Sequence, residues 1–256
     1  MFSHAIVRPP APTYADGLTS VSLGAPDFDL ALEQHERYCA ALERCGLELI
    51  RLAPDPAYPD STFVEDTAIL AAGGAIVTRP GAPSRAGEVA AIREALARRF
   101  GELAEIAAPG TLDGGDICEA DGHVFIGLSA RTNEEGARQL ADWLAARGLG
   151  SSTVDIRGRG DILHLKSGIA YLGERRLALI SSLAGHEAFR GYEIVEVADE
   201  ESYGANCVRV NDAILVASGH PRLNAALRGL GYELIELDMS EYRKQDGGLS
   251  CLSLRF

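Results

Sequence analysis

The sequence predicts a single α/β domain spanning residues 1–256, built from five strand-strand-strand-helix units around a central axis. Three observations support this prediction. A glycine followed by an alternating strand recurs along the chain, a hairpin and a helix separate successive copies, and the two ends of the chain hold complementary parts of one further unit. With 256 residues and 46% apolar side chains, the chain can bury a full core.

The recurring phrase alternates apolar with polar residues after its glycine, which is the pattern of a half-buried strand. The copies are residues 46–52, 101–106, 150–156, 191–197 and 231–237, of which the third is the weakest. Their unequal spacing indicates one structural unit with loops of variable length.

Between these phrases the sequence predicts hairpins, each followed by a helix. Gly73-Gly74 and Asp121-Gly122 are turn signals between apolar runs. The helices are marked by an apolar stripe, a capping box at residues 132–135 and Pro221 at a helix start. The expected hairpins are 62–79, 116–128, 167–181 and 207–217, and the helices after them 84–99, 132–148, 183–189 and 221–231.

The fifth unit is divided between the two ends of the chain. Residues 4–8 form an expected strand and residues 26–45 an expected helix, and the tail strand at the C-terminus needs a partner. Pairing the first and last strands would close the ring and protect its edges. An ordinary α/β sandwich is the alternative, but it fits less well because the strands come as hairpins separated by helices.

The C-terminal tail contains both a predicted strand and a candidate nucleophile. From Leu249 on, apolar residues alternate with Ser and Arg, which predicts a strand with one buried face, and Gly247-Gly248 before it permits a tight turn. Cys251 stands at the mouth of this strand. A lone cysteine in a strand is more often a small buried apolar residue than a nucleophile.

Composition excludes some partners. The chain carries 24 Lys and Arg against 37 Asp and Glu, and its net charge of −13 repels nucleic acid and anionic membrane surfaces. Five scattered cysteines without a C-x-x-C motif suggest neither disulfides nor a zinc site. With an N-terminus unlike a signal peptide and no 18-residue apolar span, we expect a cytoplasmic protein. The sequence allows a homodimer without deciding the oligomeric state.

A polar residue occupies a similar place near the start of a hairpin in each unit, and in a radial fold these places converge on the axis. They are Asp66, the Asp113 to Asp116 turn, His164, the Asn206-Cys207 pair and Cys251. Each signal is weak alone. Glu65 and Asp66 are the strongest, because adjacent acids in an apolar strand need a cationic partner when buried. One histidine with scattered aspartates lacks the spacing of metal ligands, so we expect no metal.

Six motifs together resemble the dimethylarginine dimethylaminohydrolase family of the guanidino-group-modifying (pentein) superfamily. The resemblance covers nearly the whole chain, in order, and it implies a five-bladed α/β propeller of ββαβ units with pseudo-five-fold symmetry. The motifs are Phe63-Val64-Glu65-Asp66, Leu112-Asp113-Gly114-Gly115-Asp116, residues 127–133, Leu163-His164-Leu165-Lys166-Ser167, Ala205-Asn206-Cys207 and Asp246-Gly247-Gly248-Leu249-Ser250-Cys251.

The resemblance implies a role for ten residues. Cys251 would be the nucleophile, His164 the general acid and base, and Asp113 the residue that orients His164. The substrate-binding set would be Asp66 with Glu65 on the guanidinium, Arg85 and Arg131 on the α-carboxylate, Asp60 on the α-amino group, and backbone groups of Leu18 and Gln245. Leu18 lies in a polar, glycine-containing loop suited to be a mobile lid.

The implied reaction is hydrolysis of Nω-methylated arginine to citrulline and dimethylamine or methylamine through a covalent thiouronium on Cys251. Thiolate is the strongest side-chain nucleophile for the poorly electrophilic guanidinium carbon. No cofactor is expected, and the small-molecule substrate is the expected partner.

Four alternatives remain open. An arginine deiminase shares the superfamily and the thiol, but it resembles a longer chain with a His-x-Asp motif where this sequence has His164-Leu165-Lys166. Other N-substituted arginines are also conceivable substrates. An amidinotransferase would use the same thiol, and a non-catalytic binding module would have no reason to keep Cys251, His164 and Asp66 together.

Overall fold

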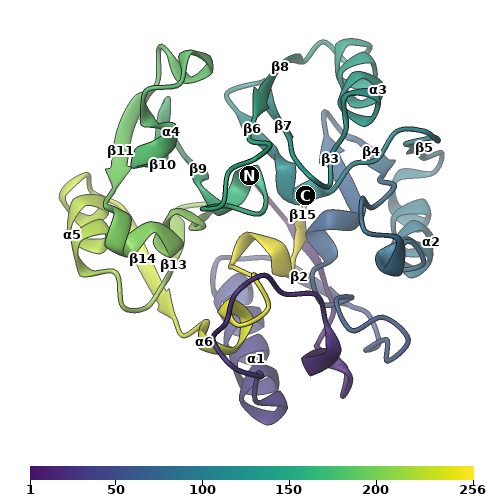
Figure 1. Cartoon of the computed structure of the whole chain (residues 1–256), viewed down its shortest axis with the longest axis horizontal. Helices are drawn as coiled ribbons and strands as arrows, with labels where there is room; N and C mark the ends of the chain where they lie inside the picture. The colour runs from purple at the N-terminus through teal and green to yellow at the C-terminus, as the bar shows by residue number, and fades with distance from the viewer.

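Five three-stranded sheets stand around a central axis in the computed structural model, which describes residues 1–256. Figure 1 shows them as a ring, with the longer helices on its outside and the C-terminal strand close to its centre. The sheets, in their hydrogen-bonded order, are β15 (Leu254–Arg255), β1 (His4–Val7), β2 (Glu48–Arg51); β3 (Ala68–Ala71), β4 (Gly74–Val77), β5 (Ala104–Glu105); β6 (Ile117–Ala120), β7 (His123–Leu128), β8 (Gly150–Asp155); β9 (Ile169–Gly173), β10 (Arg176–Ile180), β11 (Glu193–Val197); and β12 (Val208–Val210), β13 (Ala213–Ala217), β14 (Glu233–Leu237).

Every sheet has the same topology. Its first two strands are antiparallel, and its third strand runs parallel to the second. A parallel pair needs a long crossover, which the helices supply. The crossover helices are α1 (Phe28–Arg44), α2 (Val89–Phe100), α3 (Glu134–Ala145), α4 (Ser181–Ala184) and α5 (Pro221–Gly229). The predicted five-bladed α/β architecture of ββαβ units is confirmed.

The order of elements within a unit differs from the expectation. Each glycine-led strand was expected to open a unit, whereas it closes the preceding one by pairing with the strand before the helix, as β5 does with β4. The outer strands are half-exposed and the middle strands are buried, as β11 and β10 show. The exposure explains why the outer strands alternate and the middle strands are continuously apolar.

The ring is closed by the two ends of the chain. β1 pairs antiparallel with β15, with Ala5 opposite Arg255 and Ile6 opposite Leu254. The predicted pairing of first and last strands is therefore confirmed. An additional short helix, α6 (Ser240–Arg243), precedes the tail and had not been predicted.

Two predicted strands begin later than expected. The expected strand over 62–70 is a 3₁₀ turn, Val64–Thr67, before β3, and the tail expected to be extended from Leu249 is a 3₁₀ turn, Ser250–Leu252, before β15. In both segments neighbouring residues face opposite sides of a tight turn, Glu65 and Ser250 on one side and Asp66 and Cys251 on the other. A mixture of apolar and polar residues over so few positions resembles a strand.

The helix boundaries show a similar refinement. Residues 84–99 were expected as one helix, but Pro83–Arg85 is a separate 3₁₀ turn before α2. Asn133 caps α3 by accepting a hydrogen bond from Gly136 N at 2.8 Å. Thr132, expected to take part in a capping box, instead donates its hydroxyl to Asp116 at 2.7 Å.

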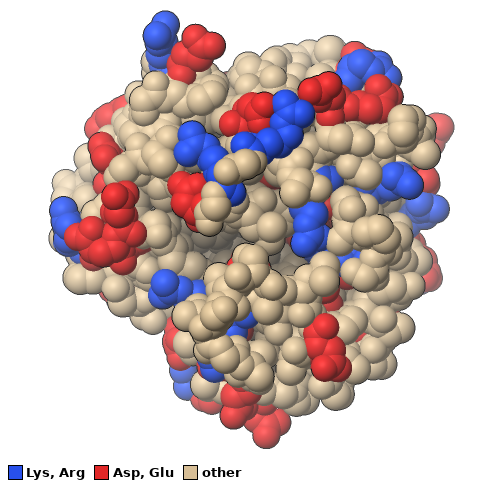
Figure 2. Space-filling model, in the orientation of Figure 1, with Lys and Arg blue, Asp and Glu red and all other residues tan.

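The apolar core is divided among the blades. The largest cluster has 22 buried residues from the third, fourth and fifth sheets, and the next has 19, including Cys39, Leu42 and Leu252. No helix is both long and apolar enough to cross a membrane. Lys and Arg side chains are interspersed with Asp and Glu on the face in Figure 2, with no continuous basic surface there.

Candidate active site

Five 3₁₀ turns, which we call the axial turns, precede the first strand of each sheet. They are Val64–Thr67, Gly114–Asp116, Leu165–Ser167, Asp199–Ala205 and Ser250–Leu252. The first contacts the second and the fifth, the second contacts the third, and the third contacts the fourth. The expected convergence of polar residues on the axis thus occurs at these turns.

One side of the axial turns forms a small pocket, which we call the cysteine pocket. Its volume is about 30 Å³, roughly the share of one water molecule in the liquid. Its lining is Leu18, Asp60, Phe63, Asp66, Arg85, Arg131, Leu163, His164, Gln245, Asp246, Gly247 and Cys251. It therefore contains eight of the ten predicted site residues, all except Glu65 and Asp113.

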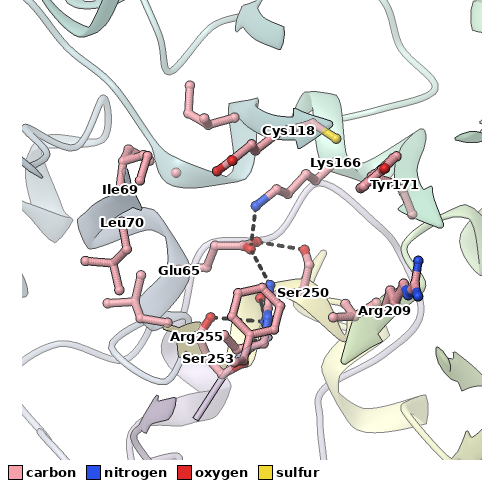
Figure 3. A pocket seen from close by; sticks show the side chains of 18 of the residues that line it. Glu65, Ile69, Leu70, Cys118, Lys166, Tyr171, Arg209, Ser250, Ser253 and Arg255 are labelled. Atoms are coloured by element: carbon pink, nitrogen blue, oxygen red, sulfur yellow. Dashed lines mark hydrogen bonds and ion pairs between the residues drawn. The ribbon is translucent and has the colours of Figure 1, made fainter. Parts of the chain in front are cut away.

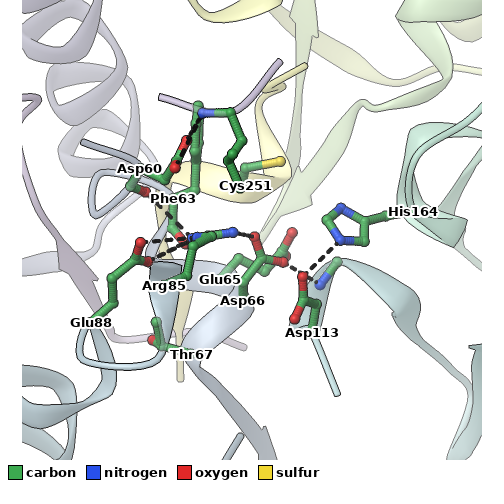
Figure 4. A network of polar contacts seen from close by, with 12 residues as sticks. Asp60, Phe63, Glu65, Asp66, Thr67, Arg85, Glu88, Asp113, His164 and Cys251 are labelled. Carbon is green, nitrogen blue, oxygen red and sulfur yellow. Dashed lines mark hydrogen bonds and ion pairs between the residues drawn. The ribbon is translucent and has the colours of Figure 1, made fainter. Parts of the chain in front are cut away.

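His164 and Asp113 form an ion pair at the wall of the cysteine pocket. His164 Nε2 lies 3.1 Å from Asp113 Oδ2, and both side chains are buried (Figure 4). Burial disfavours the charged imidazolium, but Asp66, Asp116 and Asp113 outweigh that effect and raise the pKa of His164 to about 9. The imidazole is therefore protonated at neutral pH.

Cys251 is partly buried at the start of the tail, and the charges that affect it most are negative. Burial, followed by the negative charges of Glu65 and Asp66, raises the pKa of the thiol to about 12. The resting side chain is accordingly a neutral thiol. A positively charged ligand next to it would lower that pKa.

Asp66 lies between a guanidinium and a backbone amide. Its Oδ2 accepts a hydrogen bond from Arg85 Nη1 at 2.6 Å, and its Oδ1 accepts one from Gly115 N at 2.8 Å. Burial opposes the charged form, but His164 and Arg85 lower the pKa of Asp66 to about 2. A Cβ on Gly115 would lie 2.8 Å from His164 Nδ1 and 2.9 Å from Asp66 Oδ1, so only glycine allows this close approach.

Arg85 is more completely engaged than its expected role suggests. Besides Asp66, its guanidinium binds Glu88 through Nε at 3.0 Å and Nη2 at 2.7 Å. Burial raises the pKa of Glu88 to about 7, against the opposing effect of Arg85. Arg131, by contrast, makes no ion pair and lines the cysteine pocket with its guanidinium free. Of the two arginines, Arg131 is the one available to a new anion.

The loop around Leu18 covers the cysteine pocket. Leu18 N donates to Asp60 Oδ1 at 3.0 Å, Thr19 donates to the Lys244 carbonyl at 2.9 Å, and the Ser20 hydroxyl donates to Asp246 Oδ1 at 3.1 Å. The amide of Gln245 lies 3.3 and 3.2 Å from the carbonyl oxygens of Gly17 and Leu18. Since the pocket holds little more than a water, this loop must open before an amino acid can enter.

Glu65 points to the opposite side of the axial turns from Asp66. Its carboxylate accepts hydrogen bonds from Lys166 Nζ at 2.6 Å and Ser250 Oγ at 2.7 Å, and lies 3.6 Å from Arg255 Nη2 (Figure 3). There it lines a second and larger space of about 570 Å³, which we call the far cavity. The cationic partner expected for the two acids is thus a different residue for each.

Sequence reasoning missed two supporting networks. Asp116 accepts hydrogen bonds from Ser129 at 2.6 Å and Leu165 N at 3.0 Å, and so joins the loops that carry Arg131 and His164. Asn206 exchanges two hydrogen bonds with Ser250, from Ser250 N at 2.9 Å and to Ser250 Oγ at 3.1 Å. All of these residues lie inside the six motifs, which was the available signal.

Asp66, Asp113 and His164 could in principle hold a cation, because a ligand atom from each lies within 4.8 Å of the others. Each is already engaged: Asp66 with Arg85, and Asp113 with His164 and with Gly81 N at 2.8 Å. A metal would have to break these contacts. The donor set therefore fits ion pairing and proton transfer better than metal binding.

Comparison with known proteins gives close relatives over the full length. The chain is 47% identical over 257 residues to the N(G),N(G)-dimethylarginine dimethylaminohydrolase of Pseudomonas aeruginosa, with 100% of both chains covered. It is 35% identical to the enzyme of that name from Streptomyces coelicolor, covering 98% of this chain and 96% of the relative. No protein-family model matches.

Solved structures agree with the sequence relatives. The Pseudomonas aeruginosa enzyme, as a cysteine-to-serine variant complexed with citrulline, superposes with a TM-score of 0.97 at 46% identity, covering 100% of each chain. A dimethylarginine dimethylaminohydrolase histidine-to-glycine variant, as an adduct with S-methyl-L-thiocitrulline, superposes with the same TM-score of 0.97, identity and coverage. The N-terminal domain of a cyanobacterial arginine dihydrolase shares the fold, with a TM-score of 0.88 at 17% identity, covering 100% of this chain and 97% of that one.

Proposed function

We propose that this chain, which belongs to the dimethylarginine dimethylaminohydrolase family and hydrolyses Nω-methylated arginine to citrulline, does so with Cys251 as nucleophile, His164 as general acid and base, and Asp113 orienting His164. The observation that carries these assignments is the cysteine pocket itself. Cys251 and His164 line one closed space with the ionised Asp66, and Asp113 is hydrogen-bonded to the imidazole.

Substrate binding begins with opening of the loop around Leu18. Arg131, whose guanidinium is free, binds the α-carboxylate, and Arg85 supports it from its place beside Asp66. Asp60 binds the α-amino group, and the same carboxylate holds the Leu18 amide when the loop is closed. Backbone groups of Leu18 and Gln245 complete this end of the site.

The guanidinium of the substrate lies against Asp66, next to Cys251. Glu65 contributes its negative charge from behind the axial turn and not through a direct contact. A cation arriving beside a thiol whose pKa is about 12 favours the thiolate, so the thiol proton leaves to water as the substrate binds. Binding and activation of the nucleophile are therefore coupled.

The thiolate sulfur then forms a bond to the guanidinium carbon, giving a tetrahedral adduct. The carbon–nitrogen bond to dimethylamine breaks as the His164 imidazolium donates its proton to the leaving nitrogen. A thiouronium remains on Cys251. The now neutral His164 takes a proton from water, and the oxygen of that water adds to the carbon. The carbon–sulfur bond then breaks to release citrulline and the thiol. The sulfur regains its proton from the hydroxyl of the adduct, and His164 ends protonated as it began.

Position 166 favours methylated arginine over arginine. Its side chain is a lysine bound to Glu65 in the far cavity, so it supplies no carboxylate to the leaving nitrogen. A dedicated acceptor there would be left unpaired by two methyl groups, at a cost of about 1 to 3 kcal/mol. This contact distinguishes the proposal from an arginine deiminase.

The test is release of citrulline from asymmetric dimethylarginine, monomethylarginine and arginine by the purified protein. We expect both methylated substrates to exceed arginine in kcat/KM, and substitution of Cys251 by Ser to abolish turnover. Substitution of Cys118 by Ser is the matched control, because that thiol is buried in the core and does not line the cysteine pocket. Faster turnover of arginine would favour the deiminase instead.

The cellular compartment and the oligomeric state are also part of this proposal. All five cysteines are free, and a thiol nucleophile must stay reduced, which suits the cytoplasm. Binding of methylarginine and citrulline requires only one chain, because the whole cysteine pocket comes from it. A homodimer is compatible with this arrangement and is tested by sedimentation of the purified protein.

A further inference from the structure

The far cavity has no part in the proposed reaction, yet it is built like a binding site. Its volume of about 570 Å³ falls within the range of small-molecule sites, about 300 to 1,000 Å³. Figure 3 shows Glu65 with Lys166, Ser250 and Arg255 gathered around it, and apolar side chains beside them. At the charged centre of the cavity Glu65 is buried and Lys166 and Arg255 are partly exposed, and the surroundings are apolar, which is the arrangement of a site for an amphipathic molecule.

The charged centre carries one net positive charge. It contains Lys166 and Arg255 against the single acid Glu65. Lys166 Nζ makes one hydrogen bond, and Arg255 makes its hydrogen bonds through Nη1 alone, so Nε and Nη2 have no hydrogen-bond partner in the protein. The other charged groups of the lining lie on exposed or half-buried residues, where solvent screens them: the N-terminal amine of Met1, Glu119, Asp121, Arg209 and Asp212.

We propose that the far cavity binds a small amphipathic monocarboxylate, whose carboxylate contacts Lys166 and Arg255 and whose apolar chain lies against Leu70, Ile169 and Leu254. The charge of this centre selects an anion. The apolar walls select a hydrocarbon chain over a purely ionic ligand such as acetate.

Such a ligand would act on Cys251 through the axial turns. Ser250 Oγ lies 2.7 Å from Glu65 Oε2 and 3.9 Å from Cys251 Sγ. A second carboxylate would draw Lys166 away from Glu65 and add negative charge behind the thiol, which raises the thiol pKa and slows its reaction. The titratable and charged groups that also face Cys251 are Asp60, Asp66, Arg85, Arg131, His164, Asp246 and Tyr203. This effect rests on the proposed role of Cys251, whereas binding does not.

Titration calorimetry on the intact protein tests the ligand class with three probes of equal length: hexanoate, hexan-1-ol and hexylamine. We expect one hexanoate per chain, with the alcohol and the amine bound at least about tenfold more weakly because they lack the ion pair. Saturating citrulline should leave the hexanoate site available. Displacement of hexanoate by citrulline, or equal binding of the three probes, would overturn the proposal.

Variants locate the site. The chain has two lysines, and each pairs with a buried glutamate: Lys166 with Glu65 at 2.6 Å and Lys244 with Glu241 at 2.7 Å. Lys166→Met should weaken hexanoate at least about tenfold, and Lys244→Met, outside the far cavity, should not. Ala170→Leu fills part of the cavity without changing its charge, and should weaken hexanoate even if Lys166→Met fails to fold. Unchanged affinity in Ala170→Leu would place the ligand elsewhere.

The effect on the thiol is measured by alkylation of Cys251 with iodoacetamide at fixed pH. Hexanoate should slow it roughly threefold in the native chain, since a like charge on the far side of the turn disfavours the thiolate. If hexanoate binds without slowing the alkylation, the far cavity remains a binding site but the proposed effect on Cys251 is overturned. Citrulline release from dimethylarginine, assayed without hexanoate, reports separately on the proposed function.

Discussion

The two sides of the axial turns differ although they are made from neighbouring residues. Asp66 lines the cysteine pocket and Glu65 the far cavity; Cys251 lines the first and Ser250 the second. His164 and Lys166 are divided in the same way. The cysteine pocket and the far cavity are thus separated only by the axial turns. Each acid has its own cation within the protein, Arg85 for Asp66 and Lys166 for Glu65, but only Asp66 stands in the same pocket as Cys251 and His164.

The largest effect should come from exchanging the two acids for amides. Asp66→Asn removes the carboxylate that holds the guanidinium, and we expect kcat/KM to fall by about 10³-fold or more. Glu65→Gln changes a residue on the far side, and we expect a loss of about tenfold or less. Steady-state citrulline assays measure both. Equal losses would mean that Glu65 contacts the substrate directly and that the two sides are not distinct.

The second comparison concerns how residues on each side of the axial turns affect the pKa of the Cys251 thiol. Glu65→Gln removes a negative charge that raises the pKa of Cys251, so the pKa should fall and iodoacetamide labelling at pH 8 should rise by roughly three- to tenfold. Cys207, whose pKa is raised to about 12 chiefly by burial and without a contribution from Glu65, serves as an internal control in the same peptide map. An unchanged labelling rate at Cys251 would contradict the electrostatic link across the turn.

The third comparison is of stability. Lys166→Met leaves the buried Glu65 with Arg255 at 3.6 Å as its remaining cation, and we expect the free energy of unfolding to fall by about 2 kcal/mol, less than for a fully buried pair because Lys166 is partly exposed. Adding Glu65→Gln should recover most of that loss, since a neutral amide then replaces the buried carboxylate. Urea denaturation measures both variants, and failure of the double variant to recover would assign the loss to packing.

The fourth comparison is a dependence on pH. The pKa of His164 is raised from its ordinary value near 6.5 to about 9, so its contribution to stability is fully present below pH 6.5 and is lost as the pH rises through about 9. Against His164→Asn, the native chain should lose about 1 to 3 kcal/mol of relative stability between pH 6 and pH 10. Denaturant titrations at both pH values measure it. A difference independent of pH would mean that the imidazole is neutral in the folded chain.

The smallest effect should come from the covering loop. Ser20→Ala removes one exposed hydrogen bond to Asp246, worth about 1 kcal/mol at most. Opening becomes easier, and KM should change by less than about fivefold with the thiol pKa unaffected. Thr19→Val, which removes the bond to the Lys244 carbonyl, is a matched change in the same loop. A large loss of kcat in either variant would show that the loop does more than cover the pocket.

The sequence predicted the blades better than the axis. Glycine-led strands, hairpin turns and helix stripes are local patterns. The strands β8, β11 and β14 lie within the glycine-led segments predicted over 150–156, 191–197 and 231–237. The segments around Asp66 and Cys251 were expected as strands, because a short mixture of apolar and polar residues does not distinguish a strand from a 3₁₀ turn with different spaces on its two sides.

The candidate site shows the same limit. The resemblance identified residues of the cysteine pocket, but Glu65 had been grouped with Asp66 because the two are adjacent, and Lys166 had been considered only for the carboxylate it lacks. Their pairing joins positions 101 residues apart, which no local pattern reveals. Glu88, paired with Arg85 at the start of α2, was missed for a different reason: an acid near a helix start is usually read as a surface residue.

The most direct test of the central claim is the mass of the Cys251 peptide after the His164→Gly variant is mixed with S-methyl-L-thiocitrulline, a substrate analogue whose thiolate leaving group needs little help from a general acid. Without His164 to activate water, the thiouronium should accumulate. We expect a single adduct on Cys251, with Cys118 and Cys207 unmodified. An unmodified Cys251, together with citrulline release that survives Cys251→Ser, would contradict it.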